Sequence, residues 1–255
     1  MKKIIITISL VALSQFTFAQ KGSFVVGVKI NPASNVATVD DNDGRSSKDY
    51  YSSDGVTSKT QNESGMAAII FIDYYKSNNW AISSGLGITQ KNFNITNTDG
   101  TYHGSSVYQA NYFQIPLLLK YVSKEFKPNF KYYINAGPTF NFRMSEKLVG
   151  GDGAHYWNMA NNFTDLDKTR GKNASGKAMP LFNAFDISLY LSGGVSYKLM
   201  DDLDAFGGIM LDFGLMNLVN SDLKFTDANQ TKVSSGTTWR SNLIGLELGL
   251  AYKLK

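Results

Sequence analysis

The sequence predicts an all-β protein, an eight-stranded antiparallel up-and-down transmembrane β-barrel with short periplasmic turns and four long extracellular loops. Three observations support this prediction. The chain begins with a segment typical of exported proteins. Beyond it, no stretch is apolar for long enough to form a transmembrane helix, whereas runs of about ten residues alternate between apolar and polar side chains. Short turns alternate with long polar connections, as in a barrel with both termini on one side.

The N-terminal segment has the layout of a secretory signal peptide. Lys2 and Lys3 precede the apolar stretch Ile4–Leu13, and Thr17 and Ala19 are the small residues that a cleavage site requires. A transmembrane anchor needs about 20 apolar residues, and polar residues interrupt this stretch. We therefore predict that residues 1–19 are cleaved and that residues 20–255 form a single barrel domain.

The composition excludes several classes of protein. Among 255 residues there is no Cys, which excludes a disulfide scaffold, a Cys-ligated metal and a thiol nucleophile. Only two His accompany 16 Phe, 14 Tyr and 3 Trp, so few groups titrate near neutral pH. The formal charge of +4 falls to +2 without Lys2 and Lys3, which is too weak and scattered for a nucleic-acid-binding surface.

Eight alternating runs are predicted to be the strands. In the first, Phe24–Asn31, the row Phe24, Val26, Val28 and Ile30 alternates with smaller or polar residues. One face would meet lipid and the other an enclosed polar interior. The other runs are Gly65–Tyr75, Trp80–Lys91, Tyr108–Tyr121, Phe130–Arg143, Phe185–Leu199, Leu203–Leu218 and Ile244–Leu254.

Connections and aromatic residues predict the two ends of this barrel. The short turns are Lys76–Asn79, Val122–Asn129 and Met200–Asp202, and the long loops are Pro32–Ser64, Thr96–Val107, Met144–Asn183 and Val219–Arg240. Aromatic residues near the short turns predict one interfacial belt: Tyr74, Tyr75, Trp80, Tyr121, Phe126, Phe130, Tyr197 and Tyr252. A second belt is predicted toward the long loops: Phe93, Tyr112, Phe140, Phe142 and Phe185. In a soluble β-protein these aromatics would instead form the core.

Charged residues of both signs fall on the inward faces. They are Lys29, Lys91, Lys120, Lys131, Arg143, Lys198, Lys253, Asp73, Asp186, Asp204, Asp212 and Glu247. An eight-stranded barrel is only just wide enough to be filled by side chains, so we expect these charges to pair across a plugged lumen. An ion-conducting path is the alternative, but no single sign predominates. Inward glycines are expected to leave room for the long Lys and Arg side chains.

Two prolines lie within predicted strands, and each belongs to a recognisable motif. We expect a β-bulge near Pro116 and near Pro138, because proline removes a donor from the ladder. Tyr112–Tyr121 resembles the Y-x-x-I-P-L-L-L-K-Y strand of the PorT-like small outer-membrane β-barrel family, and Asn135–Pro138 resembles its following A-G-P strand. Gly27–Asn31 and Phe213–Leu218 resemble its opening and late motifs.

The resemblance implies an eight-stranded barrel in the outer membrane of a Gram-negative envelope, and little about activity. Only the namesake of the family is tied to a protein-secretion system. The sequence departs from the family pattern at Ile30, where glycine is usual, and at Met210-Leu211, where an Arg-Tyr pair is usual. It also lacks a terminal aromatic residue, so Tyr252 would have to serve as the assembly signal.

Catalytic and metal-binding motifs are weak. His103 and His155 lie in predicted loops near Asp and Ser residues, and lipid-modifying outer-membrane barrels offer a precedent for such groups. Asp40–Gly44 superficially suggests a calcium loop, but Tyr50 stands where the twelfth-position carboxylate is required. The first loop has an acidic excess that would suit divalent cations at the surface, although a solvated loop explains it more simply.

The leading hypothesis is a non-catalytic, loop-displaying barrel of the cell outer membrane, without cofactor or bound metal. We expect contacts with outer-membrane lipid and lipopolysaccharide, a monomeric state, an envelope protein as a possible partner, and no nucleic acid. One alternative is a lipid-modifying barrel enzyme that uses His103 or His155. The other is an accessory component of protein secretion or envelope assembly.

Overall fold

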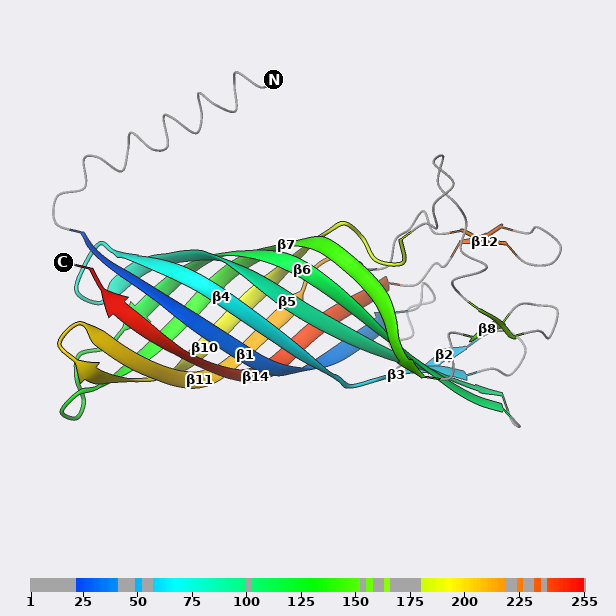
Figure 1. The fold of residues 1–255 in the computed structure, drawn as a ribbon, viewed down its shortest axis with the longest axis horizontal. Helices are drawn as coiled ribbons and strands as arrows, with labels where there is room; N and C mark the ends of the chain where they lie inside the picture. Colours follow the sequence, from blue (N-terminus) through cyan, green and yellow to red (C-terminus); the bar gives the residue numbers. More distant parts are fainter. Residues whose placement is uncertain are drawn as a thin grey trace, which may run out of the picture.

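The computed structural model is a closed antiparallel β-barrel (Figure 1). It describes residues 22–40, 49–51, 57–99, 102–151, 155–157, 163–165, 180–218, 224–226, 232–234 and 238–254. In these ranges the eight barrel strands are β1 (Ser23–Asp40), β4 (Glu63–Tyr75), β5 (Trp80–Asp99), β6 (Tyr102–Val122), β7 (Phe130–Gly151), β10 (Phe185–Met200), β11 (Leu203–Gly214) and β14 (Thr238–Lys253). The predicted fold class is therefore confirmed.

Neighbouring strands pair in the order β5-β4-β1-β14-β11-β10-β7-β6, and a β5–β6 pairing closes the ring. The first and last barrel strands, β1 and β14, lie side by side, with pairs from Val25–Lys253 to Asp40–Thr238. The three short turns lie at the end where β1 begins and β14 ends (Figure 1). Three short strand pairs beyond the barrel complete the described elements: β2 (Asp49–Tyr51) with β3 (Thr57–Gln61), β8 (His155–Trp157) with β9 (Phe163–Asp165), and β12 (Lys224–Thr226) with β13 (Lys232–Ser234).

The barrel strands are longer than the alternating runs, and this corrects the predicted boundaries. β5 and β6 pair from Trp80–Tyr121 to Asp99–Tyr102, so most of the predicted loop Thr96–Val107 is a regular hairpin. Backbone hydrogen bonds need no apolar row, so Asn-, Thr- and Ser-rich strands continue past the length that crosses the hydrocarbon layer. The alternating pattern marks only the membrane-spanning part of each strand.

Side chains sort onto two faces as the alternation predicts. Leu246, Leu248 and Leu250 on β14 are 44–53% exposed on the outside, whereas Glu247 between them is fully buried. On β4, Asp73 points inward as predicted, and Ile69 and Phe71 lie on the same face, so the interior contains apolar as well as polar groups. Two of the predicted belt residues are corrected: Phe93 and Tyr112 are buried inside the barrel, because both lie on the inward face of their strands.

The predicted bulges at Pro116 and Pro138 are wrong, because each proline interrupts one ladder without shifting its register. Pro116 interrupts the β5–β6 pairing and remains paired with Thr139 on the other side. Pro138 interrupts the β6–β7 pairing and remains paired with Leu189. Ser84, the one polar residue in the outward row of β5, donates its hydroxyl to the Pro116 carbonyl (2.8 Å). A serine is thus accommodated on the outward face because its hydroxyl is satisfied there.

Register shifts occur elsewhere: one in the β10–β11 pairing between Lys198 and Met200, and two in the β6–β7 pairing toward the C-terminal end of β7. The pairing changes between Asn111 and Tyr112, which leaves Met144 on β7 as an extra residue, and changes again between Val107 and Tyr108. Met144 itself remains exposed, and from Ser145 to Lys147 the inward and outward positions of β7 are exchanged. This exchange brings Glu146 toward the barrel mouth.

Inward glycines make room for aromatic rings rather than for lysine side chains. A Cβ built on Gly27 would lie 2.4 Å from the Phe71 ring, and one built on Gly249 would lie 2.4 Å from the Phe206 ring. The two rings pack edge to face, with centroids 5.8 Å apart. The expectation that these glycines accommodate Lys and Arg side chains is therefore corrected at both positions.

Within the described ranges, no helix combines the length and the apolar character of a membrane-spanning helix.

Candidate functional site

The lumen contains ion pairs at successive heights, starting near the short turns. There Lys120 on β6 donates to Asp73 on β4, with 2.6 Å between Nζ and Oδ2. The ammonium also lies 5.4–5.9 Å from the ring centroids of Phe71, Tyr133 and Phe206. The positive charge of buried Lys120 is therefore compensated by the Asp73 carboxylate and by the negative faces of the three aromatic rings.

The middle of the lumen is held by Lys29 on β1 and Glu247 on β14, whose Nζ and Oε2 atoms are 2.6 Å apart. Tyr190 on β10 donates its hydroxyl to Glu247 and accepts hydrogen bonds from Lys29 and Asn31, each at 3.2 Å. Ser192 donates to the second Glu247 oxygen at 3.1 Å. Both oxygens of this buried carboxylate are therefore satisfied.

A third pair lies farther from the short turns, where Lys91 on β5 contacts Asp186 on β10 at 2.8 Å. Asn141 donates to the same Asp186 oxygen at 3.3 Å and to Ser188 at 3.1 Å. The side chains of Lys91 and Asp186 are at most 1% exposed. Lys91–Asp186 joins β5 to β10, which are separated by β6 and β7, whereas Lys120–Asp73 bridges over β5 and Lys29–Glu247 joins the adjacent strands β1 and β14.

Asp212 is a fourth buried carboxylate, and it forms no ion pair with any described residue. The neighbouring cation Lys91 is already bonded to Asp186. One oxygen each of Asp212, Asp186, Gln114 and Asn141 also has no hydrogen-bond partner in the structure. The three lysines of the described lumen therefore face four carboxylates.

The barrel mouth is covered by the residues Pro180–Ala184, which we call the mouth segment. Glu146 accepts hydrogen bonds from the backbone N–H groups of Leu181 (2.8 Å) and Phe182 (3.0 Å), and from Arg143 (2.7 Å). Phe182 is fully buried and stacks on Phe93, with ring centroids 4.9 Å apart. The segment thus covers the lumen at the end opposite the short turns.

Leu218, which follows β11 and is also fully buried, joins the chain after β11 to the mouth segment. Its carbonyl accepts the Asn183 N–H at 2.7 Å, and the Asn183 side chain donates to the Asn217 carbonyl at 2.7 Å. The Arg143 N–H donates to the Ala184 carbonyl at 2.8 Å. Phe182 is therefore fixed by the bonds of its own backbone to Glu146, by those of its neighbours Asn183 and Ala184, and by its stacking on Phe93.

The remaining predicted charges lie at the short-turn end and do not join these pairs. Lys131 and Asp204 are half-buried. Lys253 is exposed, which corrects its inward assignment, because β14 ends at this residue. Lys198 pairs at 2.9 Å with Asp201 in the β10–β11 turn instead of across the lumen, and this ammonium lowers the pKa of Asp201.

Sequence reasoning missed Glu146 and Phe182. Strict alternation from Arg143 assigns Glu146 to the outward face, and only the bulge at Met144 reverses this. Phe182 belongs to a predicted loop, where its single aromatic ring gave no periodic signal.

Replacing Glu146 by Ala is expected to release the mouth segment while leaving the barrel intact. The change removes the acceptor of three charge-assisted hydrogen bonds, so local opening should become at least about tenfold more frequent. Limited proteolysis in detergent would measure this as faster cleavage at residues 180–184. The control is Lys147→Ala at the exposed neighbouring position; equal cleavage of both variants would contradict the assigned role.

The candidate histidines and the calcium-like segment are only partly described. His103 lies in β6, paired with Thr98, and His155 lies in β8, paired with Asp165. Their side-chain contacts and most of Asp40–Gly44 lie outside the described residues. Among the described residues, no group of three or more His, Asp or Glu is arranged to hold a metal ion.

Comparison with known proteins agrees with this architecture. The family model described as "Outer membrane protein beta-barrel domain" matches residues 18–220. The outer membrane protein OprG of Pseudomonas aeruginosa superposes with a TM-score of 0.51 at 13% identity, over 92% of this chain and 97% of that one.

Neisserial surface protein A is similar at 13% identity over 92% of this chain and 100% of that one, with a TM-score of 0.42. No curated protein matches the chain by sequence. The family match covers well over half of the chain, and the OprG superposition shows the same fold. The chain belongs to the outer membrane protein beta-barrel domain family and is an integral outer-membrane protein with an eight-stranded barrel.

Proposed function

We propose that this protein is a non-catalytic scaffold whose filled barrel presents its extracellular hairpins and loops to other molecules. The observation that carries the proposal is the set of three ion pairs inside the lumen, covered at the other end by the mouth segment. The side chains of these pairs are at most 12% exposed, which favours a filled, rigid barrel over a channel for a substrate. We therefore expect other molecules to bind the hairpins and loops that extend beyond the membrane.

The extended hairpin formed by β5 and β6 supports the same role. These strands contain 20 and 21 residues, about twice the 9–11 that cross a membrane. Their outer parts remain in register up to Asp99 and Tyr102. A paired hairpin is a better binding platform than an unpaired loop, because less conformational entropy is lost on contact.

We further propose a closer relationship to the PorT-like barrels, with an envelope partner and an accessory role in secretion or assembly. Two residues of the Ile115–Tyr121 motif support it through their structural roles. Pro116 accepts the Ser84 hydroxyl, and Lys120 forms the ion pair with Asp73. We propose that the protein is a monomer surrounded by outer-membrane lipid and lipopolysaccharide.

The scaffold role is tested by shortening the β5–β6 hairpin. Replacing residues 96–105 by Asn-Gly would join Ile95 to Ser106, which are already paired, through a two-residue turn. The variant should reach the outer membrane at the wild-type level and migrate faster on gels before heating than after, but lose cross-links from the hairpin to envelope components. Retained cross-links would contradict the role of the hairpin.

The same cells distinguish the scaffold from an enzyme. Lipid A is expected to have the same mass spectrum with the wild-type protein, with the shortened variant and without the protein. A change in lipid A that requires His103 or His155 would overturn the non-catalytic proposal.

Export is expected to remove residues 1–19. The cleavage motif places the new N-terminus at Gln20, so the first residues of the purified protein should read Gln-Lys-Gly-Ser. N-terminal sequencing or intact mass measures this directly. Retention of Met1 in protein from the outer membrane would contradict it.

A further inference from the structure

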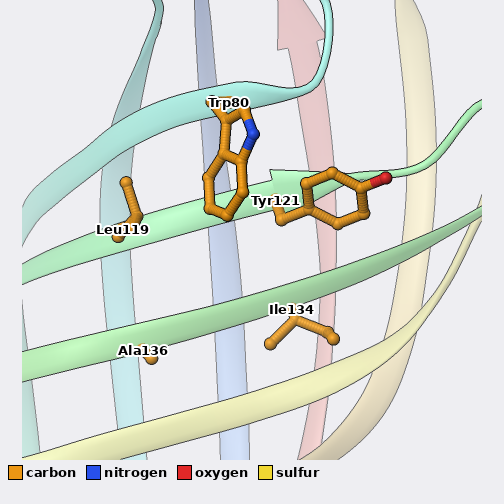
Figure 2. Close-up of a pocket in the computed structure, with 5 residues that line it drawn as sticks. All are labelled: Trp80, Leu119, Tyr121, Ile134 and Ala136. Atoms are coloured by element: carbon orange, nitrogen blue, oxygen red, sulfur yellow. The ribbon is translucent and has the colours of Figure 1, made fainter.

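A hollow of about 370 Å³ lies on the outer surface of the barrel near the short turns. It is lined by Trp80 on β5, Leu119 and Tyr121 on β6, and Ile134 and Ala136 on β7. Figure 2 shows the Trp80 and Tyr121 rings side by side, with the Tyr121 hydroxyl directed away from Ala136. The volume is at the lower end of the range for small-molecule sites, about 300–1,000 Å³.

Small outward residues create the hollow. Ala136 stands in the row of Ile82 and Leu119, and its short side chain leaves a gap between the larger neighbours. Gly193 on β10, paired with Ile134, adds no side chain on the next strand. At the other edge, the Trp80 and Tyr121 rings lie 5.0 Å apart between centroids and form a wall at the level of the interfacial belt. The hollow therefore runs from the interface into the hydrocarbon layer.

The two short turns that adjoin the strands lining this hollow contain exposed basic residues. The β4–β5 turn is clamped to the end of β6, because Asn79 accepts the Val122 N–H (2.8 Å) and donates to its carbonyl (2.7 Å). Lys76 is exposed on the first of these turns, and Lys124 and Lys127 are exposed on the second, where Glu125 is the one acid. The third short turn, between β10 and β11, instead contains Asp201 and Asp202.

We propose that this hollow binds an acyl chain of an anionic phospholipid from the periplasmic leaflet, with the phosphate group against Lys76, Lys124 and Lys127. Only apolar side chains line the hollow below the Tyr121 hydroxyl, which suits hydrocarbon. The net positive charge of the two clamped turns attracts an anionic headgroup, whereas the acidic third turn repels one. Charge and shape thus select the same side of the barrel.

Native mass spectrometry of the mature protein tests this proposal. The protein is released from nanodiscs that contain equal amounts of phosphatidylglycerol and phosphatidylethanolamine, and the retained lipids are counted. The wild type should retain mainly phosphatidylglycerol. Ala136→Leu fills the hollow and should weaken retention about fourfold, the effect of about one buried methylene group. Ala68→Leu, at an exposed outward position on β4, is the matched control and should retain lipid like the wild type.

The charge component is tested separately. The triple variant Lys76→Gln, Lys124→Gln, Lys127→Gln should lower the preference for phosphatidylglycerol at least about fivefold, while Lys147→Gln at the opposite end should leave it unchanged. Equal retention of both lipids by the wild type, or equal retention by Ala136→Leu and Ala68→Leu, would overturn the proposal. So would a dimer that Ala136→Leu dissociates, because a second copy of the chain would then occupy the hollow.

Discussion

Replacing Glu247 by Gln is expected to lower the free energy of unfolding by about 3–5 kcal/mol. The change leaves the Lys29 ammonium buried in the middle of the lumen without a negative partner. It also replaces the carboxylate that accepts the Tyr190 and Ser192 hydroxyls. An uncompensated buried charge costs far more than the ion pair itself contributes, which explains the large expected effect.

Asp212→Asn is the matched control, because it also neutralises one buried carboxylate. Asp212 has no ion-pair partner among the described residues, so this variant leaves no new unpaired charge. Its free energy of unfolding is expected to stay within about 1 kcal/mol of the wild-type value or to rise. Urea titration of both variants in phospholipid vesicles, followed by the mobility of unheated samples on gels, measures the difference. Equal destabilisation by the two changes would contradict the assignment of three paired carboxylates and one unpaired one.

Replacing Leu248 by Arg is expected to destabilise the protein by about 2–4 kcal/mol and to reduce assembly into the membrane. Leu248 is 45% exposed on the outward face of β14, directly beside the inward Glu247. Tyr252 lies on the same face, four residues closer to the short-turn interface. The cost of a lipid-facing charge falls to about 0–1 kcal/mol near the interface, so Tyr252→Arg should be tolerated much better.

The same titration compares these two variants, and the amount of heat-modifiable protein in the outer membrane gives an independent readout. A soluble β-protein would tolerate arginine at both outward positions equally well. Equal stability of Leu248→Arg and Tyr252→Arg would therefore contradict a membrane location for this face.

Alternation predicted the membrane-spanning strands well because lipid imposes it. Between an apolar solvent and a narrow polar lumen, each residue of β14 from Ile244 to Tyr252 has its environment fixed by parity alone. The same reasoning located Lys29, Lys91 and Lys120 inside the barrel. Beyond the membrane the constraint disappears, and the outer half of the β5–β6 hairpin lost its signal although its pairing continues.

The ion-pair partners and the β-bulges could not be predicted from the alternation of inward and outward residues. Which carboxylate meets which lysine depends on the register and closure of eight strands, so Lys29–Glu247, whose residues are 218 positions apart, carries no local signal. The bulge at Met144 reversed the faces of β7 and brought Glu146 to the mouth. Proline chemistry indicated Pro116 and Pro138 as bulge sites, but a missing donor on one side is tolerated without an extra residue.

Accessibility along one strand tests the central claim most directly. The chain contains no Cys, so single cysteines at each position from Ile244 to Tyr252 can be spin-labelled without background in reconstituted vesicles. The structure predicts that collision with oxygen, which concentrates in the bilayer, is high at the even-numbered positions and low at the odd-numbered ones. Collision rates without a two-residue period, or with maxima at Gly245, Glu247 and Gly249, would contradict a barrel whose apolar rows face lipid.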